Sequence, residues 1–320
     1  MNSKRIFLFL AISAGVLLLA PFFGAERLVA EDFWDPLSPT HRIFFGLRLS
    51  RLAVTLFVGG ALAILGTSYQ VLFQNSLAEP YLLGVSSAVM LGIVVGETLF
   101  HFPPGLTASH LCGWAGALGV TGLLVLSYLF RRGPNFERLI LFGLGLNFLL
   151  SSLLFLLLSY HYQQMGGGTF RFLFGQIPWA DGRDLAWLFG CGLPLILVIF
   201  LMGRHLDALS LGDSVARTLG FSPLSSRITL IVITSTLVAL ITSVTGAIGF
   251  VGLVIPHAVR LSCAPSTNRT TLALSFVAGA AFLTFSDVLS RTLLPPFEFP
   301  IGIVTTLVGG PIFLGLLWKR

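Results

Sequence analysis

A succession of apolar segments, each bounded by charged residues or by clusters of proline and glycine, constrains the fold of this chain most strongly. We place them near residues 6–23, 52–73, 81–100, 111–130, 138–160, 185–203, 228–245, 250–260, 272–294 and 301–318. A helix needs about 20 predominantly apolar residues to cross a bilayer, and only the eighth segment is too short to do so unaided. Because lipid offers the backbone no hydrogen-bond partners, helices are the expected solution. The pattern predicts an all-α polytopic membrane protein, one transmembrane domain over residues 1–320 with about ten transmembrane helices.

The composition supports this interpretation and excludes other classes. Hydrophobic residues make up 55% of the chain and charged residues 10%, with a mean hydropathy of +0.92, which does not suit a water-soluble surface. The net charge is +6, but the basic residues are scattered between apolar segments, so we expect membrane lipid and not nucleic acid as a partner. Cys112, Cys191 and Cys263 are far apart and form no Cys-x-x-Cys pair, so we expect no disulfide framework and no metal site.

The basic residues also indicate an orientation. Lys4 and Arg5 precede an apolar run over residues 6–20, which is compatible with a secretory signal cleaved near Ala25. Since many apolar segments follow, a retained first helix with its basic end in the cytoplasm fits better. With that start, 12 of the 19 lysines and arginines fall on the cytoplasmic side, and this excess predicts that both termini are cytoplasmic.

Three sequence blocks carry a family resemblance. Residues 48–92 join two apolar segments through the polar sequence Gln-Asn-Ser-Leu-Ala-Glu-Pro at 74–80. Residues 246–260 read Gly-Ala-Ile-Gly-Phe-Val-Gly-Leu-Val-Ile-Pro-His-Ala-Val-Arg, and residues 299–311 read Phe-Pro-Ile-Gly-Ile-Val-Thr-Thr-Leu-Val-Gly-Gly-Pro. In this order the blocks resemble those of FecCD-type permeases, the membrane subunits of ATP-binding cassette (ABC) importers for iron-siderophore, haem and cobalamin.

The resemblance implies an inverted-repeat type II ABC importer permease fold in a bacterial cytoplasmic (inner) membrane. It also implies three kinds of protein partner: a second copy of the chain, two ABC ATPase subunits, and a periplasmic or lipid-anchored substrate-binding protein. The chain would be the permease that translocates an iron-siderophore, haem or cobalamin type substrate delivered by that soluble protein. The sequence does not choose among these substrates, and oxyanions are carried by some relatives.

The lysines bear on where ATP is hydrolysed. The chain has only two, Lys4 and Lys319, and neither follows a glycine-rich loop. A phosphate-binding P-loop needs its lysine, so we do not expect this chain to be an enzyme. ATP and Mg²⁺ would be bound by the partner ATPase, and we expect no cofactor in this chain.

The predicted cytoplasmic loop 204–227 contains Leu-Gly-Asp-Ser-Val-Ala-Arg-Thr-Leu-Gly-Phe at 211–221, which is similar to the family's ATPase-coupling element. Asp213 and Ser214 are favourable at a helix start, Gly220 is a natural stop, and the spacing places Ala216 and Leu219 on one face. An ordinary capped loop helix is the alternative. The residues that the resemblance assigns to coupling are Gly212, Ala216, Arg217, Leu219 and Gly220.

The polar sequence at 74–80 interrupts the apolar pattern at membrane depth. Such a break is tolerated only where it faces protein or water. The resemblance places Asn75 and Leu77 at the cytoplasmic translocation gate. Ser76 replaces the proline that is usual in the family.

Three arginines, Arg48, Arg51 and Arg291, lie at the predicted outer ends of apolar segments. A lone arginine at such a position usually extends to the lipid headgroups. The resemblance instead assigns these positions to docking of the soluble binding protein, whose glutamates would pair with them. We therefore predict a cationic docking site on the outer face.

Two other classes of protein compete with this interpretation. An ion-coupled secondary transporter of a small organic or metal-chelate substrate would need buried acids as relays, and Asp287 and His257 are the remaining ionisable residues in or near the late segments. Asp287 fits better as a group that forms a hydrogen bond between helices, and His257 fits better as the source of a structural hydrogen bond. An intramembrane enzyme would need a nucleophile beside a base, and the sequence shows no such pair.

Overall fold

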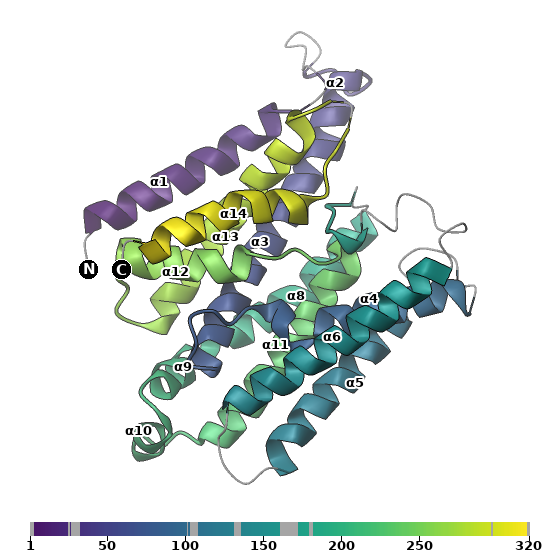
Figure 1. Cartoon of the computed structure of the whole chain (residues 1–320). Helices are drawn as coiled ribbons and strands as arrows, with labels where there is room; N and C mark the ends of the chain where they lie inside the picture. Colours follow the sequence, from purple (N-terminus) through teal and green to yellow (C-terminus); the bar gives the residue numbers. More distant parts are fainter. Residues whose placement is uncertain are drawn as a thin grey trace.

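The computed structural model describes residues 3–24, 26, 33–100, 102, 108–130, 136–160, 172–178, 182–295 and 297–318, and every regular element in them is a helix. In chain order these are α1 (Ser3–Leu19), η1 (Ala20–Phe22), α2 (Pro39–His41), η2 (Arg42–Arg48), α3 (Leu49–Leu72), η3 (Pro80–Leu83), α4 (Val85–Thr98), α5 (Ala108–Phe130), α6 (Phe136–Tyr160), α8 (Gly182–Leu201), α9 (Gly203–Ser210), α10 (Asp213–Thr218), α11 (Pro223–Thr245), α12 (Val251–Cys263), α13 (Asn268–Thr292) and α14 (Ile301–Trp318) (Figure 1).

The prediction of an all-α polytopic protein is confirmed, because a helix occupies each of the expected apolar segments. Within the described residues, six helices are long and apolar enough to cross a membrane, and a seventh is obtained if α8 and α9, which meet at a 46° bend, form one span. The elements α4, α12 and α14 are shorter apolar helices. The number of ten complete spans therefore stays a prediction.

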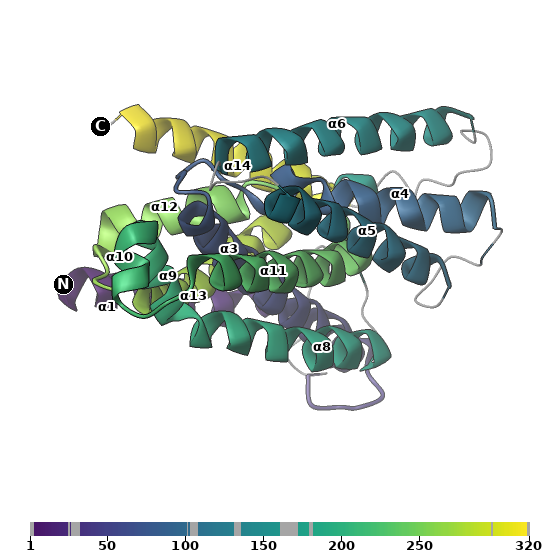
Figure 2. The same ribbon diagram turned by 90° about the horizontal axis from the view of Figure 1, so that it is seen from below.

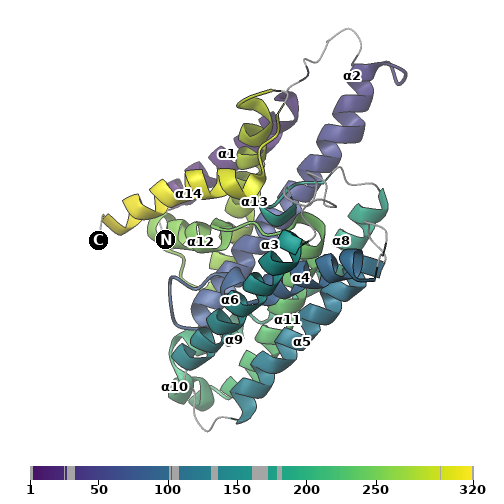
Figure 3. The same cartoon turned by 45° about the vertical axis from the view of Figure 1, so that its right-hand side comes forward.

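The long helix α3 passes between two groups of helices. One group contains α1, α12, α13 and α14, and the other contains α4, α5, α6, α8 and α11; α3 packs against members of both (Figures 1 and 3). The chain ends described here, Ser3 and Trp318, lie at the same end of the bundle as α9 and α10, as the view in Figure 2 also shows. We call this the α10 end, and the opposite end, which carries α2, the α2 end.

Glycines allow the central helix to approach its neighbours closely. A Cβ added to Gly59 of α3 would lie 2.3 Å from the carbonyl oxygen of Gly279 in α13, and a Cβ added to Gly279 would lie equally close to the carbonyl oxygen of Gly59. A Cβ on Gly66 of α3 would lie 1.8 Å from the carbonyl oxygen of Gly252 in α12. In lipid, where apolar burial gives little driving force between helices, such close backbone packing is a main source of association.

Backbone N–H groups at the helix breaks donate hydrogen bonds to other parts of the chain. The hydroxyl of Tyr81 accepts from the backbone N–H of Ile248 at 2.9 Å, and a carboxylate oxygen of Glu79 accepts from that of Phe250 at 2.6 Å. The N–H of Ile301 donates to the carbonyl of Gly175 at 2.8 Å. The break at 74–80 thus faces protein along part of its length, as expected for irregular backbone at membrane depth.

Candidate functional site

The segment at the α10 end that follows α8 folds as two short helices. Gly212, whose φ of +96° suits glycine, separates α9 from α10. Helix α10 begins at Asp213 and closes with a Schellman motif, in which the N–H of Gly220 donates to Arg217 and that of Phe221 to Ala216, both at 3.0 Å. The expected start and stop of this helix are confirmed.

An ion pair fixes α10 to the bundle. Two guanidinium nitrogens of Arg227, in the first turns of α11, lie 2.6 and 2.8 Å from the two carboxylate oxygens of Asp213. The Arg227 side chain is 1% exposed, so this bidentate pair is shielded from water and salt on the arginine side. This pair ties α10 to α11.

The exposed side of α10 differs from the sequence interpretation. Ala216 is fully buried, whereas Leu219 is 56% exposed, so the expectation that they share a face is wrong. The exposed side chains of this segment are instead the apolar ones of Leu211, Val215 and Leu219, together with that of Arg217. The surface that this segment offers to a partner is this apolar strip, which we call the coupling strip.

The two sites predicted for gate and coupling share one cavity at the α10 end. Its volume is about 540 Å³, and its lining residues are Gln70, Val71, Gln74, Asn75, Ser76, Ser210, Leu211, Gly212, Arg260 and Asn268. The cavity brings Asn75, predicted at the gate, to the same space as Gly212, predicted for coupling. We call residues 73–79, which connect α3 to η3, the gate loop.

Local hydrogen bonds give the gate loop a defined shape. The side-chain oxygen of Asn75 accepts from the N–H of Leu77 at 2.9 Å, and its carbonyl accepts from Ala78 at 3.1 Å. This turn leaves the Leu77 side chain half exposed. An exposed apolar side chain on an ordered turn suits a constriction that closes against another surface.

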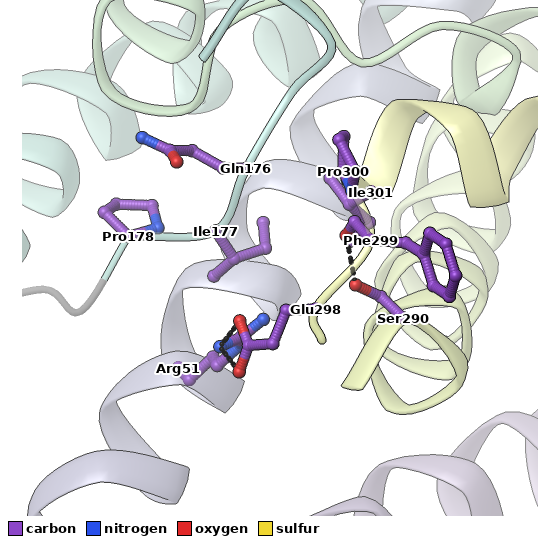
Figure 4. A pocket seen from close by; sticks show the side chains of 9 residues that line it. All are labelled: Arg51, Gln176, Ile177, Pro178, Ser290, Glu298, Phe299, Pro300 and Ile301. Atoms are coloured by element: carbon purple, nitrogen blue, oxygen red, sulfur yellow. Dashed lines mark hydrogen bonds and ion pairs between the residues drawn. The ribbon is translucent and has the colours of Figure 1, made fainter. Parts of the chain in front are cut away.

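The three arginines predicted as a docking site are buried at the α2 end, where Arg51 and Arg291 form an ionic cluster with Asp287 and Glu298. Figure 4 shows Arg51 and Glu298 of this cluster. The Nε atom of Arg51 lies 2.8 Å from Asp287, and its Nη1 lies 3.1 Å from Glu298. The Nε atom of Arg291 lies 3.3 Å from the other oxygen of Asp287. Arg48 donates to the carbonyl oxygens of Pro21 at 3.0 Å and Phe22 at 3.2 Å.

The premise that these arginines are free charges at the rim is wrong. All three are buried, and each is bonded to other parts of the same chain. The interpretation of Asp287 as a helix–helix group is confirmed, because it links α13 to α3. Glu298, the one member of the cluster with a partly exposed side chain, at 33%, was not predicted from the sequence. A buried arginine needs an acid or backbone carbonyls as partners, and that need was the available signal.

Glu298 also borders a second cavity, of about 290 Å³, at the α2 end. Its polar side chains come from Arg51, Gln176, Ser290 and Glu298, and the rest of the lining comes from residues 177–178 and 299–301 (Figure 4). The hydroxyl of Ser290 donates to the carbonyl of Phe299 at 2.5 Å, which holds the segment before α14 against α13. The ionic cluster is therefore part of the wall of an accessible hollow.

A chain of apolar helices whose breaks are satisfied by side chains and backbone of the same chain, with an exposed helix strip and an interior loop lining one cavity, fits the class of polytopic transport permeases. Residues 7–319 match the model of the FecCD transport family, and the chain belongs to that family. This confirms the predicted family.

The curated relatives include permeases of one named system. The vitamin B12 import system permease protein BtuC of Escherichia coli O139:H28 is 35% identical over 98% of this chain and 95% of its own length. The protein of the same name from Salmonella paratyphi A is 37% identical over 97% of this chain and 94% of its own length.

Solved structures show the same fold. A structure described as an inward-facing conformation of a metal-chelate type ABC transporter superposes with a TM-score of 0.86 at 26% identity, covering 100% of both chains. PsaBC from Streptococcus pneumoniae in complex with Fab superposes with a TM-score of 0.60 at 17% identity over 90% of this chain and 95% of its own, which shows the fold alone. The predicted ABC permease fold is confirmed.

Proposed function

We propose that this chain is the membrane-spanning permease of an ABC importer that takes up a metal chelate delivered by a soluble binding protein. Two copies would form the transporter, with the substrate path between them, and two separate ATPase subunits would bind at the α10 end. The observation that carries this proposal is the shared cavity, because Leu211 of the coupling strip and residues 74–76 of the gate loop line it together. An ion-coupled carrier has no need of such a connection.

The proposed substrate is cobalamin. The support is the likeness to two permeases named for vitamin B12 import over nearly the whole chain, together with the likeness to a metal-chelate type transporter. Haem and iron-siderophore complexes are the alternatives within the same chemical class. All are large, so the path between two copies suits them better than a pore within one bundle.

In the proposed mechanism the coupling strip lies in a groove of the ATPase. Closure of the ATPase upon ATP binding moves α10, and the pair between Arg227 and Asp213 makes α11 move with it. The gate loop then changes position across the shared cavity. The α10 end, with both termini, would be cytoplasmic, and the binding protein would dock at the α2 end.

Docking to Arg48, Arg51 and Arg291 stays a prediction, in a changed form. Because the guanidinium groups are already bonded, carboxylates of a partner must compete with Glu298 and with backbone carbonyls. Since each new contact would replace an existing one, we expect these arginines to contribute only weakly to binding.

The proposal is tested by reconstitution. Proteoliposomes that contain the chain, its ATPase and the binding protein are expected to accumulate cyanocobalamin only when ATP is present on the side of the membrane that carries the ATPase. The purified chain alone should hydrolyse no ATP. Uptake is measured with labelled cyanocobalamin, and haem and a ferric siderophore serve as competing substrates. Uptake driven by a proton or sodium gradient in the absence of the ATPase would establish the secondary transporter instead.

Leu219→Asp is expected to weaken binding of the ATPase by about tenfold or more, because burying a leucine at an interface contributes roughly 1.5–3 kcal/mol. The permease should still fold, since Leu219 is exposed. Co-purification of the ATPase with the detergent-solubilised permease measures the effect. The matched control is Leu293→Asp, a similarly exposed leucine at the α2 end, which should retain the ATPase. Equal retention in both variants would remove the coupling strip from the interface.

A further inference from the structure

The gate loop begins with a residue in an unfavourable backbone conformation. Helix α3 ends at Leu72, and Gln74 follows with φ of +50°, in the left-handed region. The N–H of Gln74 donates to Val71 at 3.2 Å and that of Asn75 to Gln70 at 3.1 Å, which is the Schellman pattern. Glycine normally occupies this position, because a Cβ is strained there.

The Gln74 side chain reaches the coupling segment. Its Nε2 atom donates to the carbonyl oxygen of Leu209 at 3.3 Å. Leu209 lies in the last turn of α9, and its carbonyl also accepts from the N–H of Gly212 at 3.2 Å, directly before α10. A strained position thus holds a side chain that joins the gate loop to the segment that leads into α10.

The far end of the gate loop is attached to a different part of the protein. Glu79 accepts from the N–H of Phe250 at 2.6 Å, at the first turn of α12. A carboxylate at a helix N-terminus makes a charge-assisted bond that is stronger than a bond between neutral groups. The loop therefore has a firm attachment to the transmembrane core at Glu79 and a weaker, exposed attachment to the coupling segment at Gln74.

We propose that Gln74 is the positioning residue that transmits the movement of α9 and α10 to the gate loop, which turns about its attachment at Glu79. The inference rests on the proposed function, since it requires an ATPase that moves α10. The backbone strain at Gln74 supports the inference. Glycine would adopt this conformation without strain, yet the position carries a side chain able to reach Leu209. The bond requires a donor at that position, and glutamine supplies one.

The experiment follows the exposure of the gate loop in the complex with the ATPase. The native Cys112, Cys191 and Cys263 are replaced by alanine, and Ser76→Cys, at an exposed position of the cavity wall, reports the rate of reaction with a water-soluble maleimide. The rate with ATP and vanadate is compared with the rate without nucleotide. With Gln74 present, we expect nucleotide to change the labelling rate.

The variants separate the hydrogen bond from the shape of the side chain. Gln74→Glu keeps the length but places an acceptor against the Leu209 carbonyl, so the nucleotide response should fall by about two- to tenfold, the effect of one lost hydrogen bond. Gln74→Lys supplies a donor again and should restore the response. Ser266→Glu, which adds the same charge at an exposed site between α12 and α13, is the charge control and should respond normally.

Gln74→Gly distinguishes transmission from a structural role. Glycine relieves the left-handed strain, so the melting temperature should rise while the nucleotide response falls. If Gln74 only ended α3, glycine would raise the melting temperature and leave the nucleotide response normal. A normal response in Gln74→Glu and Gln74→Gly, in a complex that assembles and responds with Gln74, overturns this inference alone. A permease that fails to bind the ATPase, or shows no response with Gln74, overturns the proposed function and this inference with it.

Discussion

Asp287→Ala is expected to destabilise the protein by about 3–5 kcal/mol, because it leaves Arg51 and Arg291 as buried charges without their shared carboxylate. Asp287 is 2% exposed, so water cannot replace the lost oxygens. Removing one partner of a buried pair costs more than the pair contributes, since the remaining charges keep their desolvation penalty. The measurement is the unfolding transition in detergent micelles.

Two further variants serve as controls for this prediction. Glu298→Ala removes the more exposed acid of the same cluster and should cost much less than Asp287→Ala, since solvent can reach its place. Adding Arg51→Met to Asp287→Ala should recover part of the lost stability, because one uncompensated charge is then gone. If Asp287→Ala were as stable as the wild type, the ionic cluster would not stabilise the packing of α13 against α3.

Gly66→Leu is expected to prevent the native packing of α3 against α12. Even the Cβ atom would lie 1.8 Å from the carbonyl oxygen of Gly252, and the obstacle is backbone, which cannot rotate away. Overpacking of a core typically costs about 1–3 kcal/mol when side chains can adjust, so a backbone collision should cost more. The expected result is loss of the monodisperse folded protein in size-exclusion chromatography, with Gly66→Ala intermediate.

The matched control is Gly119→Ala in α5. Gly119 is exposed on its helix, and a Cβ there would meet nothing within 4 Å. The substitution should be neutral or stabilise by up to about 1 kcal/mol, the usual gain from replacing a helical glycine by alanine. A folded, fully active Gly66→Leu would show that α3 and α12 do not pack as described.

The helices were predictable from the sequence because apolar length is a local property, and the segments at 52–73 and 228–245 became α3 and α11 with shifts of a few residues. The ends of α10 were predictable for the same reason, since Asp213 and Gly220 act within one turn. The family followed from three local blocks, and its model covers residues 7–319.

The partners of charged groups were not predictable, because they depend on distance in space. Arg51 and Asp287 are 236 residues apart in the chain, and nothing near Arg51 reveals that an acid of α13 will meet it. The sequence of a short helix also does not determine how the helix is oriented on the protein. The spacing of Ala216 and Leu219 suggested one shared face. The pair between Arg227 and Asp213 ties α10 to the bundle, and in that position Ala216 is buried. Gln74 gave no signal, since glutamine is not typical of a left-handed helix end.

The glycine contacts of α3 limit how the permease can change shape. Helices separated by a layer of side chains can slide by exchanging rotamers, whereas α3 meets α12 and α13 with backbone on backbone at Gly66 and Gly59. Axial sliding there would drive carbonyl oxygens into Cα atoms, so these three helices form a mechanical unit without a shear plane. In the proposed transporter, alternating access would then require rotation of whole units about the short hinges at their ends, and amide hydrogens along α3 should be among the last to exchange with solvent.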